Sequence, residues 1–176
     1  MKDKKLRITA NVIFAVVIVV CSTACEPDGS SGRVSWGRND GTLAAYVPSE
    51  AHIVGLTEIE AVSSGPWQGK LTVYVDLLDT FGCRVKSPGL FRFELYEFVP
   101  RSSQPRGKRI FFPRDIDLTD AAENNKRWRD FLRAYEFKMP LDFEPQPDQS
   151  FVLEVTFTTP YGSRLRDTFQ LRYQNR

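Results

Sequence analysis

After residue 43, apolar and polar side chains alternate in several short runs, which is the pattern of strands with one buried face. The clearest run is 71–77, with the sequence Leu-Thr-Val-Tyr-Val-Asp-Leu. The side chains predicted to face a core are Leu71, Val73, Val75 and Leu77, and those predicted to face out are Thr72, Tyr74 and Asp76. The other runs with the same period are 91–96, 134–139, 151–157 and 165–173.

The two C-terminal runs are separated by Pro160-Tyr161-Gly162, a turn-forming sequence, so we expect them to form a hairpin. A first strand region is predicted over 46–48 and 52–62, and Pro48 favours an edge or a bend there.

The stretch 100–109 is polar and basic, contains Pro105 and Gly107, and is predicted to be a loop. Residues 110–112 then predict a short strand that Pro113 ends. Farther on, Asp120 with Glu123 three residues later is a capping-box-like signal for a short helix, which we expect to end at 124–127.

Six or seven short strands and one short helix predict a mainly β domain over 43–176, folded as an antiparallel β-sandwich. The spacing Val75-x-Leu77-Leu78-Asp79-x-x-Gly82-x-x-Val85 resembles the strand-turn-strand of Ig-like and C2-like sandwich modules on bacterial envelope proteins. The resemblance implies a fold and no particular activity, because such sandwiches carry many unrelated functions.

The N-terminal segment has the pattern of an export signal. Residues 1–7 carry four cations, and 8–20 are almost wholly apolar, a run too short for a typical membrane-spanning helix. Ser22-Thr23-Ala24-Cys25 then resembles the lipobox of bacterial lipoproteins, although Ser22 stands where that family generally has an aliphatic residue. The resemblance implies that 1–24 is a signal peptide and that Cys25 is diacylated.

Two alternatives stay open for this segment. The small residues before Cys25 also fit an ordinary secretory cleavage site, which would release a soluble protein. The segment could instead stay attached as a signal anchor. In the soluble case, Cys25 could pair with Cys83.

Residues 25–42 are rich in Gly, Ser, Asp and Asn and predict a flexible tether between the anchor and the domain. Trp36 within it could enter the interfacial zone of a bilayer or cover an edge of the domain.

Charge argues against a nucleic-acid partner. The formal net charge is +2, but the first seven residues contribute four basic residues and one acidic residue. The rest of the chain has 20 basic and 21 acidic residues, a net charge of −1. A nucleic-acid-binding domain needs a basic surface, so none is predicted here.

The candidate chemistry is sparse, and no cofactor is predicted. The chain has three cysteines and one histidine, His52, which is too few for common nucleophilic or multi-histidine metal sites. Cys83 is predicted to be either a free thiol or a buried small hydrophobe. We therefore expect no enzymatic activity.

Three further groups have both a functional and a structural interpretation. Asp115, Asp117 and Asp120 could supply oxygen ligands to calcium, but their spacing is not that of an EF-hand and Asp120 also fits a helix cap. Trp67 and Trp128 could stack on sugar rings or pack in the domain. The basic residues that could meet anionic headgroups or acidic glycans, or stay solvated, are Arg101, Arg106, Lys108 and Arg109.

Together these features favour a cell-envelope protein held to the membrane by lipid at Cys25 and facing the periplasm or the exterior. The domain is expected to be a non-catalytic binding or structural module with a protein or glycan partner. A calcium- or glycan-dependent binding domain is the alternative, and an envelope enzyme is the least favoured.

Overall fold

The computed structural model describes residues 45–61 and 69–174. The predicted signal peptide 1–24, the tether 25–42, Cys25, Trp36 and Trp67 lie outside these residues and stay predictions. No helix in the described part of the chain is long and apolar enough to cross a membrane.

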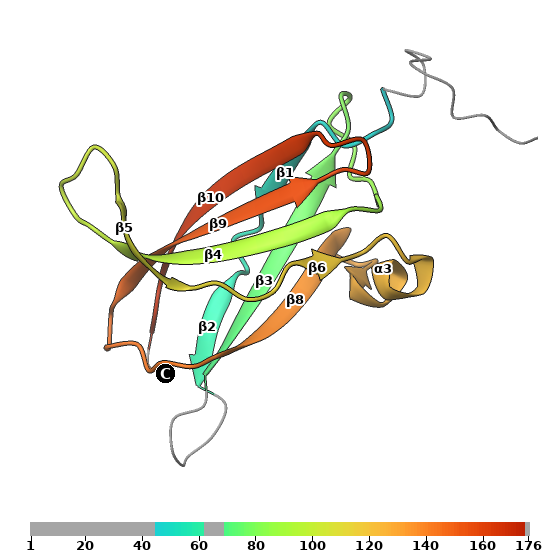
Figure 1. The fold of residues 1–176 in the computed structure, drawn as a ribbon. Helices are drawn as coiled ribbons and strands as arrows, with labels where there is room; N and C mark the ends of the chain where they lie inside the picture. Colours follow the sequence, from blue (N-terminus) through green and yellow to red (C-terminus); the bar gives the residue numbers. More distant parts are fainter. Residues whose placement is uncertain (1–44, 62–68, 175–176) are drawn as a thin grey trace, which may run out of the picture. The chain divides into compact units, whose positions relative to one another are not determined.

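The described residues form two antiparallel sheets of five strands each, as Figure 1 shows. Sheet A contains β1, β2, β3, β8 and β7, and sheet B contains β10, β9, β4, β5 and β6. The prediction of a mainly β sandwich with one short helix is confirmed. The elements are β1 (Glu50–Ile53), β2 (Glu58–Ala61), β3 (Gly69–Leu78), β4 (Leu90–Phe98), β5 (Arg106–Phe111), β6 (Ile116–Asp117), α3 (Ala121–Arg127), β7 (Trp128–Arg129), β8 (Ala134–Leu141), β9 (Ser150–Thr158) and β10 (Arg164–Arg172).

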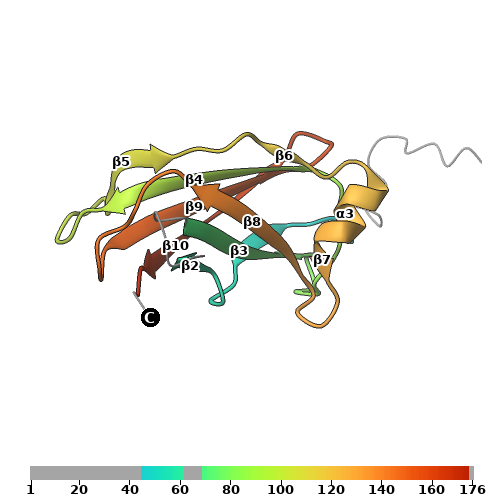
Figure 2. The same ribbon diagram turned by 90° about the horizontal axis from the view of Figure 1, so that it is seen from below.

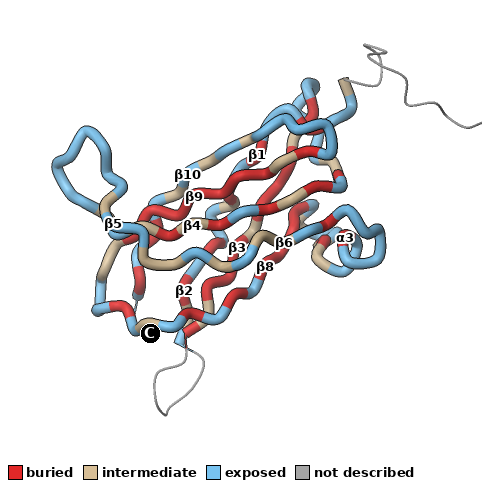
Figure 3. The backbone as a smooth tube through the Cα atoms, in the orientation of Figure 1, coloured by how far each residue is buried: buried red, intermediate tan, exposed pale blue. Residues whose placement is uncertain are grey.

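The core lies between the inner faces of the two sheets. Buried positions alternate along β1 and β4, whereas β3, β8 and β9 are buried at most positions (Figure 3). Phe91 of sheet B is its centre, because its ring lies 4.8 Å from that of Phe137 and 4.7 Å from that of Phe157. The inward alternation predicted for 71–77 and 91–96 is confirmed: every predicted inward side chain there is at most 1% exposed.

The outward prediction for 71–77 is wrong in one respect. Thr72 and Asp76 do lie on the outer face of sheet A, yet both are buried, and Tyr74 is half-buried. Long polar side chains cover that face, as with Arg84 of the connection after β3, whose Nε lies 2.7 Å from Asp76 Oδ2.

The single strand region predicted over 46–48 and 52–62 is wrong in two respects: 46–48 precede the first strand, and the rest is divided into two strands. β1 and β2 both pair with β3, but a turn at Val54–Thr57 separates them. The turn is closed by the Thr57 N–H, which donates to the Val54 carbonyl at 3.0 Å. The Ile53 N–H faces away from β3 and donates to Asp167 Oδ2 of β10 at 2.7 Å, which joins the edges of the two sheets.

The prediction of a loop over 100–109 is also wrong, because β5 begins at Arg106 and pairs with β4. The connecting turn is shorter and is closed by the Val99 N–H, which donates to the Pro105 carbonyl at 2.9 Å. A Cβ on Gly107 would lie 2.8 Å from Val99 Cγ2, so the glycine permits this close return.

The predicted helix start and C-terminal hairpin are both confirmed. Asp120 caps α3, and its Oδ1 accepts from the N–H groups of Ala122 and Glu123 at 3.0 Å each. β9 and β10 pair along their whole length across a turn that contains Gly162 at φ 87°. The described residues form ten strands where six or seven were predicted, partly because the two-residue strands β6 and β7 are too short to leave a pattern.

Candidate functional site

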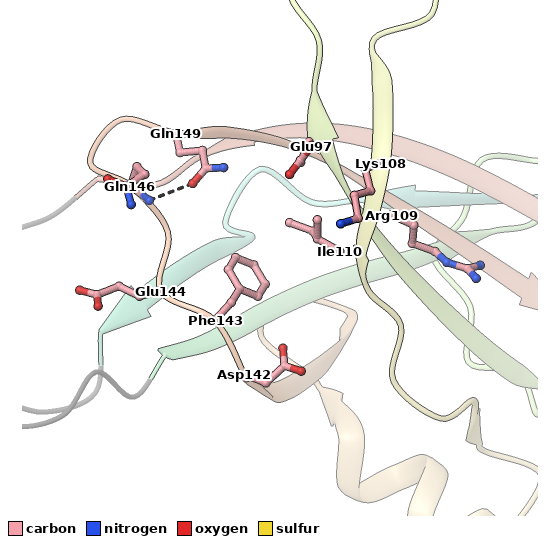
Figure 4. Close-up of a pocket in the computed structure, with 9 residues that line it drawn as sticks. All are labelled: Glu97, Lys108, Arg109, Ile110, Asp142, Phe143, Glu144, Gln146 and Gln149. Atoms are coloured by element: carbon pink, nitrogen blue, oxygen red, sulfur yellow. Dashed lines mark hydrogen bonds between the residues drawn. The ribbon is translucent and has the colours of Figure 1, made fainter.

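An open pocket of about 510 Å³ lies between β5 and the segment 142–149 that connects β8 to β9 (Figure 4). It is placed where the chain crosses from sheet A to sheet B at one end of the sandwich. Its lining consists of Glu97, Lys108, Arg109, Ile110, Asp142, Phe143, Glu144, Gln146 and Gln149.

Irregular pairing on one side and a braced connection on the other produce this pocket. The register between β4 and β5 shifts on both sides of Tyr96. Segment 142–149 is braced by the end of β10, because the Tyr173 N–H donates to the Gln149 carbonyl at 2.8 Å. The Gln146 N–H donates to Gln149 Oε1 at 2.8 Å, which fixes the amide on that wall.

The lining has an apolar floor and a polar rim. In Figure 4 the Phe143 ring points toward Ile110, and both side chains are half-buried. Phe143 is held from behind by Phe151, with 6.0 Å between ring centroids. The rim offers carboxylate, ammonium and amide groups, which together can donate and accept hydrogen bonds. None of the nine lining residues is a Ser, Thr, Cys or His, so the ionisable groups of the lining are carboxylates and basic side chains.

The basic residues predicted to form a loop cluster are divided between two surfaces. Arg106 forms an ion pair with Glu154, and Arg109 Nη1 lies 2.6 Å from Glu94 Oε1, both on the outer face of sheet B. Figure 4 shows the Arg109 guanidinium directed away from the pocket. Because these two cations are matched by carboxylates, the stretch is not a free basic surface for anions.

Arg101 is the fourth residue of that predicted cluster. It lies in the turn between β4 and β5, with φ 59°, and is exposed.

The structure does not gather Asp115, Asp117 and Asp120 into a metal site. Asp115 accepts from Arg92 Nε at 3.0 Å and Nη2 at 2.7 Å, and this pairing lowers the pKa of its carboxyl group. Asp117 accepts from the N–H and the hydroxyl of Thr119, which lowers its pKa, while Asp120 caps α3. In the ranges 45–61 and 69–174, no three His, Cys, Asp or Glu side chains are grouped to hold a metal ion.

Trp128 is 8% exposed and packs edge-on against Tyr135 at 5.1 Å between centroids. Lys86 Nζ lies 5.1 Å from the Trp128 ring centroid. This ring is a packing residue and does not present a face for a sugar.

His52 and Cys83 take no part in the pocket. His52 Nε2 lies 3.1 Å from Glu50 Oε2 on the outer face of sheet A. Cys83 is exposed and has no disulfide partner among the described residues, so of its two predicted states the free thiol is observed and the buried one is wrong. It lies in the turn after β3, and its N–H donates to Asp79 Oδ1 at 2.8 Å.

A polar cluster around Glu136 lies on the outer face of sheet A and was not predicted from the sequence. Glu136 accepts from the Tyr74 hydroxyl at 3.0 Å and from Arg129 Nε at 2.7 Å, and Lys138 Nζ lies 3.1 Å away. Burial raises the pKa of Glu136, but these hydrogen bonds outweigh burial and hold the pKa below its usual value. In the sequence, Glu136 alternates with apolar neighbours like any solvent-facing residue. All the partners satisfy one another, so the cluster supports the sheet.

Comparison with known proteins gives no indication of function. No protein-family model, no curated protein and no solved structure matches this chain. The pocket between β5 and segment 142–149 is the candidate site, because it is concave and combines an apolar floor with polar groups left open to a ligand.

Proposed function

We propose that the protein is a lipid-anchored component of the cell envelope, and that its β-sandwich is a non-catalytic module that binds a glycan in this pocket. The domain would face the periplasm or the exterior, with diacylated Cys25 as its membrane anchor. One observation carries the proposal: the pocket and the point where the chain enters the domain lie at opposite ends of the sandwich.

The strand pairing defines these two ends. Glu50, at the start of β1, is opposite Leu78, at the end of β3. We name this end, with connections 45–49, 79–89, 130–133 and 159–163, the tether end. The pocket end is formed by the last residues of β4, the first residues of β9 and segment 142–149. Strands of nine or ten residues separate the ends, which is about 30 Å. Figure 1 shows the connections on either side.

A glycan suits the lining better than a charged ligand does. Sugars present hydroxyl and amide groups along their edges and C–H groups on their faces, and the rim and the Phe143 floor offer matching partners. The guanidinium of Arg109 points away, so Lys108 alone faces the carboxylates of Glu97, Asp142 and Glu144. The lining is therefore acidic and disfavours an anionic ligand, whereas a neutral sugar can bond to both kinds of group.

The anchor is tested by the intact mass of the membrane-bound protein. We expect a chain that begins at Cys25 and carries a diacylglycerol group with a further acyl chain or a free amino group. An unmodified chain beginning at Cys25, recovered in the soluble fraction, would refute the anchor and leave ordinary secretion.

The binding site is tested by titration of an N-acetylglucosamine oligosaccharide followed by amide NMR. We expect the largest shifts at the backbone and side-chain amides of Gln146 and Gln149. Gln146→Ala should weaken binding several-fold, whereas Gln170→Ala, an exposed glutamine of β10, should not. Equal effects of the two variants, or shifts confined to other surfaces, would remove the pocket as the site.

A further inference from the structure

The four most exposed large hydrophobic side chains of the described residues are all aromatic, and all lie at the tether end. Phe131 is 83% exposed, Tyr161 72%, Phe81 67% and Tyr46 63%. Single exposed hydrophobic residues are common on protein surfaces. Four aromatic rings at the tips of four connections at one end of a sandwich are a pattern that needs a partner.

The strand order brings these tips to one end although they are far apart in sequence. Tyr46 precedes β1, Phe81 follows β3, Phe131 lies between β7 and β8, and Tyr161 lies between β9 and β10. Figures 1 and 2 show these connections at the end where the chain enters the domain. The rings of Tyr46 and Phe81 also contact each other, with 5.8 Å between centroids.

The turn that carries Phe81 is held in place by hydrogen bonds to Asp79. Asp79 is buried, and its Oδ1 accepts from the Phe81 N–H at 2.9 Å and from the Cys83 N–H at 2.8 Å. The Gly82 N–H donates to the Asp79 carbonyl at 3.0 Å. The hydrogen-bonded turn therefore holds the Phe81 ring in solvent, where it does not pack in the core.

The two ends also differ in charge, and the difference favours the tether end as the one that contacts the membrane. At the tether end, connections 45–49 and 159–163 contain no charged residue, 79–89 carries Arg84 and Lys86 beside the buried Asp79, and the charges of 130–133 cancel, so the net charge is +1. At the pocket end, segment 142–149 carries three acidic residues and the turn 99–105 carries Arg101, so the net charge is −2. An anionic bilayer would therefore repel the pocket end and accept the tether end.

Chain length brings the tether end to the bilayer. Nineteen residues, 26–44, separate Cys25 from the first described residue, Ala45. As a flexible coil, a segment of that length has a mean span of about 20–25 Å. The acyl chains would therefore keep the tether end within contact distance of the headgroups, where Tyr and Phe side chains are readily accommodated.

We infer that the aromatic tips at the tether end insert into the lipid headgroup region and form a second, non-covalent contact with the membrane. This inference rests on the proposed anchor at Cys25. The two contacts together orient the sandwich upright, so that the pocket faces away from the bilayer at a distance of about 30 Å.

Cys83 provides the probe, since it is exposed, lies two residues from Phe81, and is left as a free thiol once Cys25 is acylated. The full lipidated chain is labelled there with an environment-sensitive NBD dye and reconstituted into vesicles of equal parts phosphatidylcholine and phosphatidylglycerol. We expect a blue shift of emission and strong quenching by lipids that carry a nitroxide near the headgroup.

A second labelling site and two surface variants give the controls. The dye on Cys83→Ser/Ser103→Cys, in the turn between β4 and β5, should be quenched several-fold less. Phe81→Ser with Tyr161→Ser should return the Cys83 dye to its aqueous emission. Val99→Ser at the pocket end, another exposed hydrophobic residue, should not.

The outcomes separate this inference from the proposed function. An aqueous Cys83 dye on a chain whose mass shows the lipid overturns the membrane contact and leaves the anchor intact. Equal quenching at the Cys83 and Ser103 positions shows a domain lying flat and overturns the upright orientation. A mass without lipid overturns the anchor itself, independently of the dye.

Discussion

Glu94 and Glu154 lie directly opposite each other on the neighbouring strands β4 and β9. Both carboxylates are on the outer face of sheet B, and their side chains are only 14% and 7% exposed. Two like charges directly opposite each other on neighbouring strands destabilise a sheet unless each pairs with an opposite charge. β5 supplies both partners, since Arg109 pairs with Glu94 and Arg106 pairs with Glu154.

Replacing Arg106 by Leu should therefore destabilise the domain. The change leaves the Glu154 carboxylate buried, unpaired and beside Glu94, and we expect a loss of about 1–2 kcal/mol in the free energy of unfolding. Denaturant unfolding measures it. Arg166→Leu, an exposed arginine on β10 of the same sheet, should change the value by no more than about 0.5 kcal/mol. Equal losses for the two variants would contradict the ion-pair explanation.

Gly89→Ala should be strongly destabilising, because there is no room for a side chain. A Cβ on Gly89 would lie 2.4 Å from Phe157 Cε2 and 2.7 Å from the Thr158 carbonyl oxygen. Overpacking against a core ring and a strand backbone costs about 1–3 kcal/mol. Gly55→Ala is the matched control, since a Cβ on Gly55 would have nothing within 4 Å, and its melting temperature should stay close to that of the native protein.

Tyr135→Phe should disrupt a buried polar network. The Tyr135 hydroxyl accepts from the Ser87 N–H at 2.9 Å and lies 3.0 Å from Asn124 Oδ1. Phe at this position leaves the Ser87 N–H without a partner, at a cost of about 1–3 kcal/mol. Tyr161→Phe, at an exposed turn, should have no measurable effect on unfolding.

The same residue predicts a dependence on alkaline pH. Burial raises the pKa of Tyr135, and hydrogen bonds with Ser87 and Asn124 only partly oppose this effect. Its neutral form is thus favoured in the folded state, and the stabilising contribution is full below the unfolded pKa of about 10 and is lost as pH rises through the folded pKa. Tyr135→Phe should therefore show a shallower loss of stability above about pH 10. Parallel curves would contradict the assignment.

Glu136→Gln should change the response to acid. Because the pKa of Glu136 is lowered in the folded state, its contribution is present above the unfolded value of 4.5 and is lost as pH falls through the folded pKa. The variant should be less stable at pH 7 by about 1–2 kcal/mol and should lose less on acidification. Chemical unfolding at a series of pH values checks both effects. Glu144→Gln, on the exposed segment 142–149, should leave stability at pH 7 unchanged.

The sequence predicted the parts of the fold that local patterning controls. The alternation around Val73 and Phe93, the C-terminal hairpin and the Asp120 cap all depend on neighbours within one or two elements, and all are confirmed. Arg106 and Arg109 misled the prediction, because a strand whose cations pair with carboxylates on other strands has the composition of a loop.

The candidate site could not be predicted, because it belongs to no single segment. Lys108 and Phe143 line the same pocket only because the register of β5 shifts and the chain crosses there from β8 to β9. Nor could the sequence show that Asp115 is committed to Arg92, which lies 23 residues away along the chain. Pairing between distant strands decides which polar residues stay available for a ligand, and a single sequence does not contain that pairing.

The bond from the Ile53 N–H to Asp167 has a consequence for how copies of this protein behave together. An unpaired edge strand offers its free N–H and C=O groups to the edge of another molecule, and such pairing leads to aggregation. Here one N–H on the open side of β1, that of Ile53, is occupied by a carboxylate of β10, and the turn at Val54–Thr57 interrupts the same edge. Because the Ile53 N–H is already bonded, a strand of another molecule cannot pair with β1 at that position, which limits edge-to-edge association there.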